Sequence, residues 1–242
     1  MIKPKQLTTI AASAIAITCI QIFPNHLPLY AQRPAKTSQP VPRIIYVPPN
    51  LKTPLFSRGS GSRSGCAETS LAESKIVTLL TPKSYVGQTI SARPTVFWYL
   101  FKTSAQPIKI TLMEPGVIKP LYEQQINSPQ AGIGQLQIPI ELTVGKKYSW
   151  SITLICNQKR PSLNPFFSSW IERVSTTSTL ENNLTATTSL RDRALIFAQA
   201  GLWYDTLTYI SQAKTANPQD PTLQTDFLSL LKQIGLTEII RN

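Results

Sequence analysis

Seven short segments rich in β-branched and aromatic residues follow one another between residues 75 and 176, each bounded by turn-forming residues. They span residues 76–80, 95–101, 108–113, 121–127, 134–140, 147–156 and 167–175. Segments of this length at such close spacing predict the strands of a β-sandwich. The composition agrees, because 20 Pro and 10 Gly among many hydroxyl residues favour strands joined by turns over a continuous helical bundle.

One of these segments shows the expected two-residue period most clearly. From Tyr148 to Leu154, large hydrophobic residues occupy the even-numbered positions and hydroxyl residues occupy the odd-numbered ones. Successive side chains of a strand point to opposite faces, so this pattern predicts one face directed into the core. We therefore expect an all-β sandwich over residues 66–176.

The C-terminal part of the chain changes period. Apolar runs over residues 191–200 and 203–215 are separated by Gly201, and the second ends at Asn217-Pro218. A further helix is predicted to begin after Pro221 and to end at Gly235. We expect a helical hairpin plus one helix over residues 190–242, joined to the sandwich by a Ser/Thr/Asn-rich connector over residues 177–189.

The first 31 residues have the pattern of a secretory signal peptide. Lys3 and Lys5 precede an uncharged stretch over residues 7–23, and Ala31 offers a small residue for cleavage. The alternative is an uncleaved N-terminal anchor. No later window is apolar enough to cross a bilayer, so we expect an exported protein of the periplasm or extracellular space without a transmembrane span in the mature chain.

Residues 32–65 form a Pro-rich basic stretch. They hold six prolines and six of the 24 Lys and Arg residues, with no acidic residue, in a chain of net charge +12. This composition predicts an extended linker, most simply a solvated tether. Possible partners are an envelope protein or an anionic envelope polymer, whereas nucleic acid is not expected, because only Tyr46 and Phe56 could stack on bases.

Cysteine and histidine usage narrows the chemistry. Removal of Cys19 with the leader leaves Cys66 and Cys156, for which an oxidising compartment favours a disulfide over two buried thiols. The one histidine, His26, lies in the leader, so the mature chain cannot form a Ser-His-Asp or Cys-His nucleophilic site. It also lacks the commonest ligand of zinc, copper and haem, and we expect no metal and no cofactor.

No motif in the sequence assembles an active site. The 12 acidic residues form no pattern typical of a glycosidase or a calcium loop, and phosphate-binding and nucleophile-elbow motifs are absent. We therefore expect a non-catalytic binding or scaffold protein of the cell envelope. The alternatives are an enzyme acting on polysaccharide or cell-wall material through carboxylates that only folding brings together, and a sensor module whose basic tail docks on anionic lipid.

The segment 170–174 is the most distinctive remaining one. On a strand, Trp170, Glu172 and Val174 share one face, while Ile171 and Arg173 share the other. Trp170 and Arg173 are candidates for a surface contact. The simpler interpretation is that Arg173 lies on an edge strand and limits unwanted pairing there.

Local motifs resemble known modules. Arg93-Pro94-Thr95-Val96-Phe97-Trp98 and the stretch from Leu142 to Ile152, within residues 75–176, resemble bacterial fibronectin-type-III and immunoglobulin-like modules. The resemblance implies that Trp98, Tyr148 and Trp150 are packing residues. Residues 190–220 resemble a single tetratricopeptide repeat at Ala194, Phe197, Gly201, Trp203, Ile210, Ala213 and Pro218, which gives Trp203 a packing role. One such repeat cannot bury its own faces, so we expect it to pack within the chain.

A wider resemblance rests on an ordered set of motifs. They are Gly65-Cys66, the segments 92–99, 154–156 and 170–174, and Gly201-Leu202-Trp203-Tyr204-Asp205. Together they resemble the cyanobacterial exported domain-of-unknown-function 928 family over roughly residues 60–240. This resemblance implies export and a two-part layout, and it suggests that Cys66 pairs with Cys156. It implies no reaction.

Overall fold

A computed structural model describes residues 42–49, 59–60 and 76–240 of the chain. These described residues belong to one compact unit. The predicted leader over residues 1–31, with Cys19 and His26, lies outside the described residues, as does Cys66. The predictions that rest on these residues are not tested by the structure.

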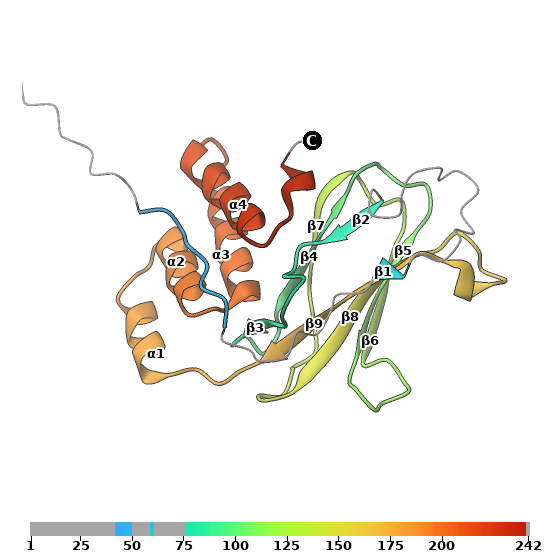
Figure 1. Ribbon diagram of the computed structural model, residues 1–242, viewed down its shortest axis with the longest axis horizontal. Coiled ribbons are helices and arrows are strands. Elements are labelled where there is room, and N and C mark those ends of the chain that lie inside the picture. Colours follow the sequence, from blue (N-terminus) through green and yellow to red (C-terminus); the bar gives the residue numbers. More distant parts are fainter. Residues whose placement is uncertain (1–41, 50–58, 61–75, 241–242) are drawn as a thin grey trace, which may run out of the picture. The chain divides into compact units, whose positions relative to one another are not determined.

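The strands form two sheets (Figure 1). The strands are β1 (Gly59–Ser60), β2 (Val77–Leu79), β3 (Gly87–Thr89), β4 (Thr95–Leu100), β5 (Ile108–Met113), β6 (Tyr122–Ile126), β7 (Gly132–Gln137), β8 (Lys147–Leu154) and β9 (Phe166–Arg173). The larger sheet has the order β1-β9-β8-β5-β6, with β3 also paired to β9, and the smaller has the order β2-β4-β7. The arrangement is that of a β-sandwich, as the spacing predicts.

All seven predicted strands are present, with ends shifted by no more than a few residues. Two further strands, β1 with two residues and β3 with three, were not predicted. The strand β3 pairs in parallel with β9, aligning Gly87 with Ile171 and Thr89 with Arg173.

The inward faces of both sheets supply the core of the sandwich. In β5, burial alternates as the two-residue period requires, with Ile108, Ile110 and Leu112 buried. The aromatic residue Trp98 of β4 lies directly over the backbone of β7, where a Cβ at Gly134 would lie 2.2 Å from the indole ring. Burial of each large apolar side chain contributes roughly 1.5–3 kcal/mol.

Four helices follow the sandwich: α1 (Ser178–Thr185), α2 (Leu190–Gln199), α3 (Trp203–Ala216) and α4 (Pro221–Gln233). The last three confirm the predicted hairpin plus one helix. The prediction of a connector over residues 177–189 is wrong in one respect, because it contains α1. The Thr177 side chain caps that helix by accepting a hydrogen bond from the Leu180 amide at 3.2 Å, and Leu180 packs with Phe197. The polar composition of residues 177–189 did not indicate this short amphipathic helix.

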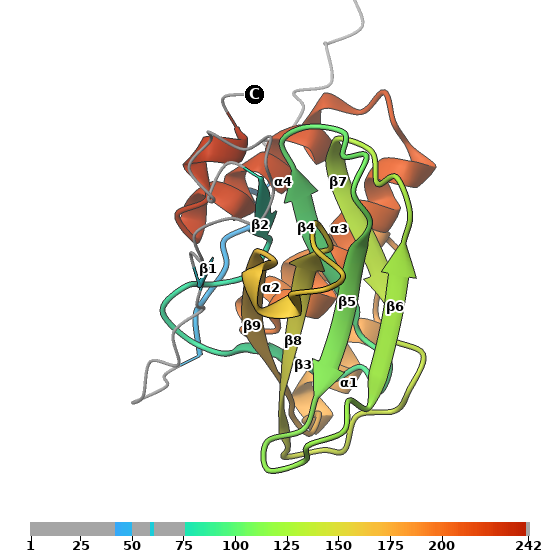
Figure 2. The same cartoon turned by 90° about the vertical axis from the view of Figure 1, so that its right-hand side faces the viewer.

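The helices lie on the side of the smaller sheet that faces away from β8 and β5 (Figures 1 and 2). One continuous hydrophobic cluster contains residues of both sheets and of α3 and α4. The helical part is therefore built onto the sandwich and packs within the chain, as we expected for a lone hairpin. Among the described residues, no helix combines the length and the apolar character needed to cross a bilayer.

Residues 42–49, which fall in the predicted linker, are packed against the helices. Ile44 and Tyr46 are buried, and the Tyr46 hydroxyl donates to the carbonyl of Gly201 at 3.1 Å. The Val47 amide donates to the carbonyl of Ala198 at 3.0 Å. This part of the stretch behaves as a strap over α2 and α4, because its alternating apolar residues find a surface that composition alone does not reveal.

Candidate functional site: a groove between the sandwich and the helices

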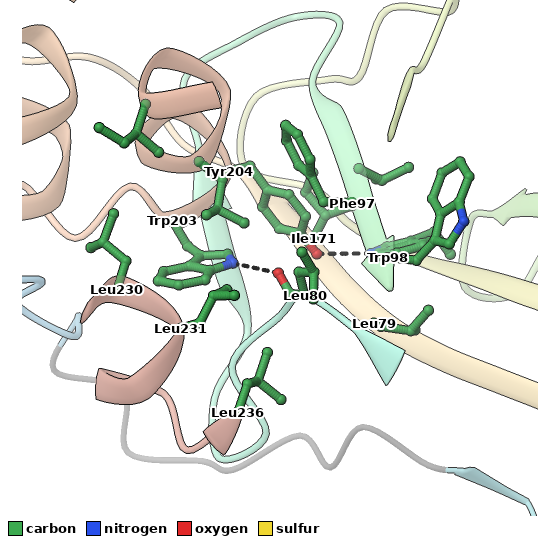
Figure 3. Packing of buried hydrophobic residues seen from close by; sticks show 14 of the residues in the cluster. Leu79, Leu80, Phe97, Trp98, Ile171, Trp203, Tyr204, Leu230, Leu231 and Leu236 are labelled. Atoms are coloured by element: carbon green, nitrogen blue, oxygen red, sulfur yellow. Dashed lines mark hydrogen bonds between the residues drawn. The ribbon is translucent and has the colours of Figure 1, made fainter. Parts of the chain in front are cut away.

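The first turn of α3, Trp203-Tyr204-Asp205, joins the helices to the sandwich, and we call it the junction. Figure 3 shows the Trp203 indole nitrogen, Nε1, directed at the carbonyl of Leu80, to which it donates a hydrogen bond of 2.8 Å. The hydroxyl of Tyr204 donates to the carbonyl of Trp170 at 2.9 Å and accepts from Trp150 Nε1 at 2.8 Å. Both aromatic side chains on α3 are buried, and their polar atoms are satisfied.

The third residue of this turn, Asp205, holds the loop after β3. Its Oδ2 accepts a hydrogen bond from the Ile90 amide at 3.1 Å, and the side chain is 5 % exposed. Burial raises the pKa of Asp205 to about 6, an effect that hydrogen bonds from the Thr89 hydroxyl and nearby amides partly oppose. The carboxyl group therefore works as a backbone anchor.

Gly87 makes room for this junction. A Cβ at position 87 would lie 2.7 Å from Cε2 of Tyr204. Real Cβ contacts are not that short, so a larger residue would displace either the ring or β3. The absence of a side chain at Gly87 leaves the space that the Tyr204 ring occupies against the sandwich.

A groove of about 670 Å³ opens beside Asp205. Strand residues Thr95, Gln135 and Gln137 line one wall, and Thr208, Tyr209 and Gln212 of α3 line the facing wall. The aliphatic side chain of Leu184 from α1 and the ring of Phe197 from α2 contribute apolar surface. The volume is within the range of roughly 300–1,000 Å³ that is usual for small-molecule sites.

Several polar groups in the groove are left over after the protein's own hydrogen bonds are made. Gln135 Oε1 accepts from Ser211 Oγ at 3.3 Å, and Gln137 Nε2 donates to the carbonyl of Arg93 at 3.3 Å. The opposite ends of these two amides make no hydrogen bond within the described residues. Neither do the Gln212 amide and the Tyr209 hydroxyl. The groove thus presents donors and acceptors that a ligand can satisfy.

The charged groups around the groove already have partners. Arg93 forms an exposed ion pair with Glu141 at 3.1 Å. Arg193 lies over the ring of Tyr209, with its Cζ 5.9 Å from the centroid, and its Nε donates to the carbonyl of Thr187 at 3.1 Å. The two charged residues of the lining, Arg93 and Asp205, have opposite signs, so the lining is polar without an excess of either charge.

The four residues expected to pack are all buried: Trp98, Tyr148, Trp150 and Trp203. The Tyr148 hydroxyl oxygen accepts a hydrogen bond from the Thr143 amide at 2.9 Å, at the corner where the chain enters β8. Trp98 differs from the other three residues, because its buried Nε1 has no hydrogen-bond partner among the described residues.

The candidates for a surface contact lie on β9 and are both half-buried. Arg173 donates from Nη1 to the carbonyl of Leu142. The expectation that it lies on an edge strand is wrong, because β3 pairs with β9 at Thr89 and Arg173. Trp170 contributes its carbonyl to the Tyr204 hydrogen bond, and neither residue lines the groove.

Cys156 is half-buried just after β8 and packs against the main core. Its predicted partner Cys66 lies outside the described residues, so the pairing stays a prediction. The described residues form no group of three or more His, Cys, Asp or Glu side chains that could hold a metal ion.

Sequence reasoning did not single out the residues that line the groove. Gln135 and Gln137 follow the alternation of a surface strand, and Gln212 occupies an exposed helical position. Several lining residues, among them Thr95, Phe197 and Asp205, belonged to highlighted motifs, but these motifs were interpreted as signs of the fold or of the family and not as a binding site. No local pattern could have shown that β7 and α3 face each other.

Comparisons with solved structures find weak similarity. A protein with an immunoglobulin-like β-sandwich fold from Bacteroides vulgatus, of the DUF3244 family, matches at TM-score 0.24 and 12% identity over 32% of this chain and 72% of its own. A multi-domain immunophilin from Arabidopsis thaliana matches at TM-score 0.16 and 6% identity over 75% of this chain and 97% of its own. Scores this low carry no argument about either fold or function.

No protein with a curated description matches the chain. In contrast, the profile of one family, described as Domain of Unknown Function (DUF928), matches residues 58–242. This range covers both the sandwich and the helices, in agreement with the resemblance of the ordered motifs. The chain therefore belongs to the DUF928 family.

Proposed function

We propose that the protein is a non-catalytic binding protein of the cell envelope and that the groove beside Asp205 is its binding site. The observation that carries this proposal is the set of unused hydrogen-bonding groups on facing walls, from Gln135 and Gln137 on one side and Tyr209 and Gln212 on the other. Side chains with such groups in a concave site are typical of ligand recognition. The junction holds the two walls together.

An enzyme using carboxylates is the alternative, and one observation favours it. The pKa of Asp205 is raised to about 6, within the range that suits a general acid. Glycoside hydrolysis, however, needs two carboxyl groups about 5–10 Å apart. Asp205 is the one acidic residue in the described lining, and its Oδ2 accepts from the Ile90 amide. This engagement supports a structural role.

The sandwich resembles a fibronectin-type-III or immunoglobulin-like module in its strand order. The order β2-β4-β7 opposite β9-β8-β5-β6, together with the hydrogen bond from the Thr143 amide to Tyr148 at 2.9 Å, supports that assignment. In the same way, the α2–α3 hairpin supports a likeness to one tetratricopeptide repeat. We propose both as the finer description of the fold.

The leader supports export to the periplasm or extracellular space, and the motif set supports a cyanobacterial source. In that compartment a Cys66–Cys156 disulfide would close a loop that spans most of the sandwich. A disulfide that closes a loop of this length stabilises a fold by roughly 4–5 kcal/mol in the chain-entropy model. Mass spectrometry of the non-reduced mature chain tests the N-terminus and the disulfide together.

Binding to isolated envelope material tests the proposed function. The immobilised mature chain is expected to retain an envelope component and to lose it on the double substitution Gln137→Ala/Gln212→Ala. Gln224→Ala is a matched control, because Gln224 is exposed on α4 and does not line the groove. Equal retention by all three proteins would reject the groove as the site, and release of soluble sugar from wall material would favour the enzyme.

A further inference from the structure

We infer that the groove binds a neutral oligosaccharide segment, an inference that rests on the proposed function and names its ligand class. The inference depends on which polar groups the groove presents, on its charge, and on its apolar surface.

The free groups in the groove are suited to hydroxylated ligands. The amides of Gln135, Gln137 and Gln212 each offer a planar donor or acceptor, and the Tyr209 hydroxyl offers both. Each hydroxyl of a sugar is likewise a donor and an acceptor, so neighbouring hydroxyls can pair with an amide from either wall. A ligand without hydroxyls would leave these groups unpaired, which disfavours its binding.

The charge of the groove disfavours a polyanion. Arg93, the cation in the lining, is paired with Glu141 at 3.1 Å, and Arg193, which lies over the lining residue Tyr209, also donates to the carbonyl of Thr187. An anionic polymer would have to compete for these groups. The buried carboxyl of Asp205 would also repel it once ionised. A neutral saccharide would neither compete for the arginine contacts nor be repelled by Asp205.

Apolar surface lies next to the polar groups. The rings of Tyr209 and Phe197 pack together with their centroids 5.0 Å apart, and Leu184 lies in the same lining. Tyr209 is half-buried and lines the groove together with Phe197. Sugar rings expose C–H groups on their faces and hydroxyls at their edges. Amides beside these lining aromatic residues therefore match both kinds of surface on one ligand.

Titration with defined glycans tests the inference. The mature chain is titrated by calorimetry with malto-, cello- and N-acetylglucosamine oligosaccharides, with polygalacturonate as the anionic probe. We expect one of the neutral series to bind with an affinity that is unchanged between low and physiological salt, since no ion pairs form. Gln212→Ala should weaken it about tenfold, the usual consequence of losing one well-made hydrogen bond in a binding site, whereas Gln224→Ala should leave it unchanged.

The outcomes separate the two proposals. Salt-sensitive binding of polygalacturonate alone, or no glycan binding by a chain that still retains envelope material through the groove, would overturn the neutral-glycan inference and leave the proposed function standing. Loss of groove-dependent retention altogether would overturn both. Neutral glycan binding that survives Gln212→Ala unchanged would place the site elsewhere and also overturn the inference.

Discussion

The first turn of α3 and its middle show two different uses of one helix. In the first turn, Trp203, Tyr204 and Asp205 are buried, and each makes hydrogen bonds to the sandwich. Two turns later, Tyr209 and Gln212 line the groove with polar groups that have no partner in the described residues. The sandwich lies against both stretches.

The difference separates stability from recognition. A buried polar group without a partner costs roughly 1–3 kcal/mol, so a junction must satisfy its donors and acceptors. A groove open to water carries no such requirement and can keep its groups for a ligand. Substitutions in the junction should therefore change the free energy of unfolding, whereas substitutions in the groove should change binding alone.

The largest effect is expected from Trp203→Ala. This change removes a fully buried indole and its hydrogen bond to Leu80, and comparable truncations cost about 3–5 kcal/mol. Urea denaturation followed by circular dichroism measures the loss. Trp170→Ala is the control, because that side chain is only half-buried and should lose less. Equal losses for the two variants would contradict the special role of the junction.

The second effect is a dependence of stability on pH caused by Asp205. Its pKa is about 6 in the folded chain and 3.8 as the ordinary value, so the folded state holds the proton more tightly. The resulting stabilisation is complete below pH 4, is lost as the pH rises through 6, and is about 3 kcal/mol at most. The comparison is with Asp205→Asn, which keeps an acceptor for the Ile90 amide.

Subtracting the unfolding free energy of Asp205→Asn from that of the unmodified chain isolates this titration. The difference should fall between pH 4 and pH 6 and be flat above pH 7. A difference that rises with pH would show that the carboxylate is stabilised as an anion, and that burial is not the dominant influence.

A smaller loss is expected for Gly87→Ala. The added Cβ would meet the Tyr204 ring at 2.7 Å, and overpacking of this kind costs roughly 1–3 kcal/mol. Tyr204→Leu removes the far part of the ring, so the two substitutions together should destabilise the chain by less than the sum of their separate effects. Strict additivity in denaturation measurements would show that the ring and β3 do not conflict.

The smallest effect on stability is expected for Gln212→Ala. The side chain is exposed and makes no hydrogen bond within the described residues, so the free energy of unfolding should change by less than about 0.5 kcal/mol. A change of 2 kcal/mol would show that this part of α3 belongs to the junction after all. Thermal unfolding followed by calorimetry provides the measurement.

Local patterns were sufficient for most of the fold. The strand periods predicted the seven main strands, and the breaks at Gly201 and Pro218 separated the last three helices, because these signals depend on a few neighbouring residues. The short strand β3 and the helix α1 escaped, since their stability comes from β9 and from Phe197 in distant parts of the sequence. The strap over residues 42–49 escaped for the same reason.

We could derive from the sequence the family, the order of the seven main strands and of the last three helices, and the apolar residues available for a core. The three-dimensional structure was needed to show that Trp203, Tyr204 and Asp205 form a junction and that Gln137 and Gln212 face one groove. Period and composition record how a residue relates to its neighbours along the chain. Hydrogen-bond partners and concave surfaces depend instead on which distant segments meet, and that follows from the packing of the whole unit.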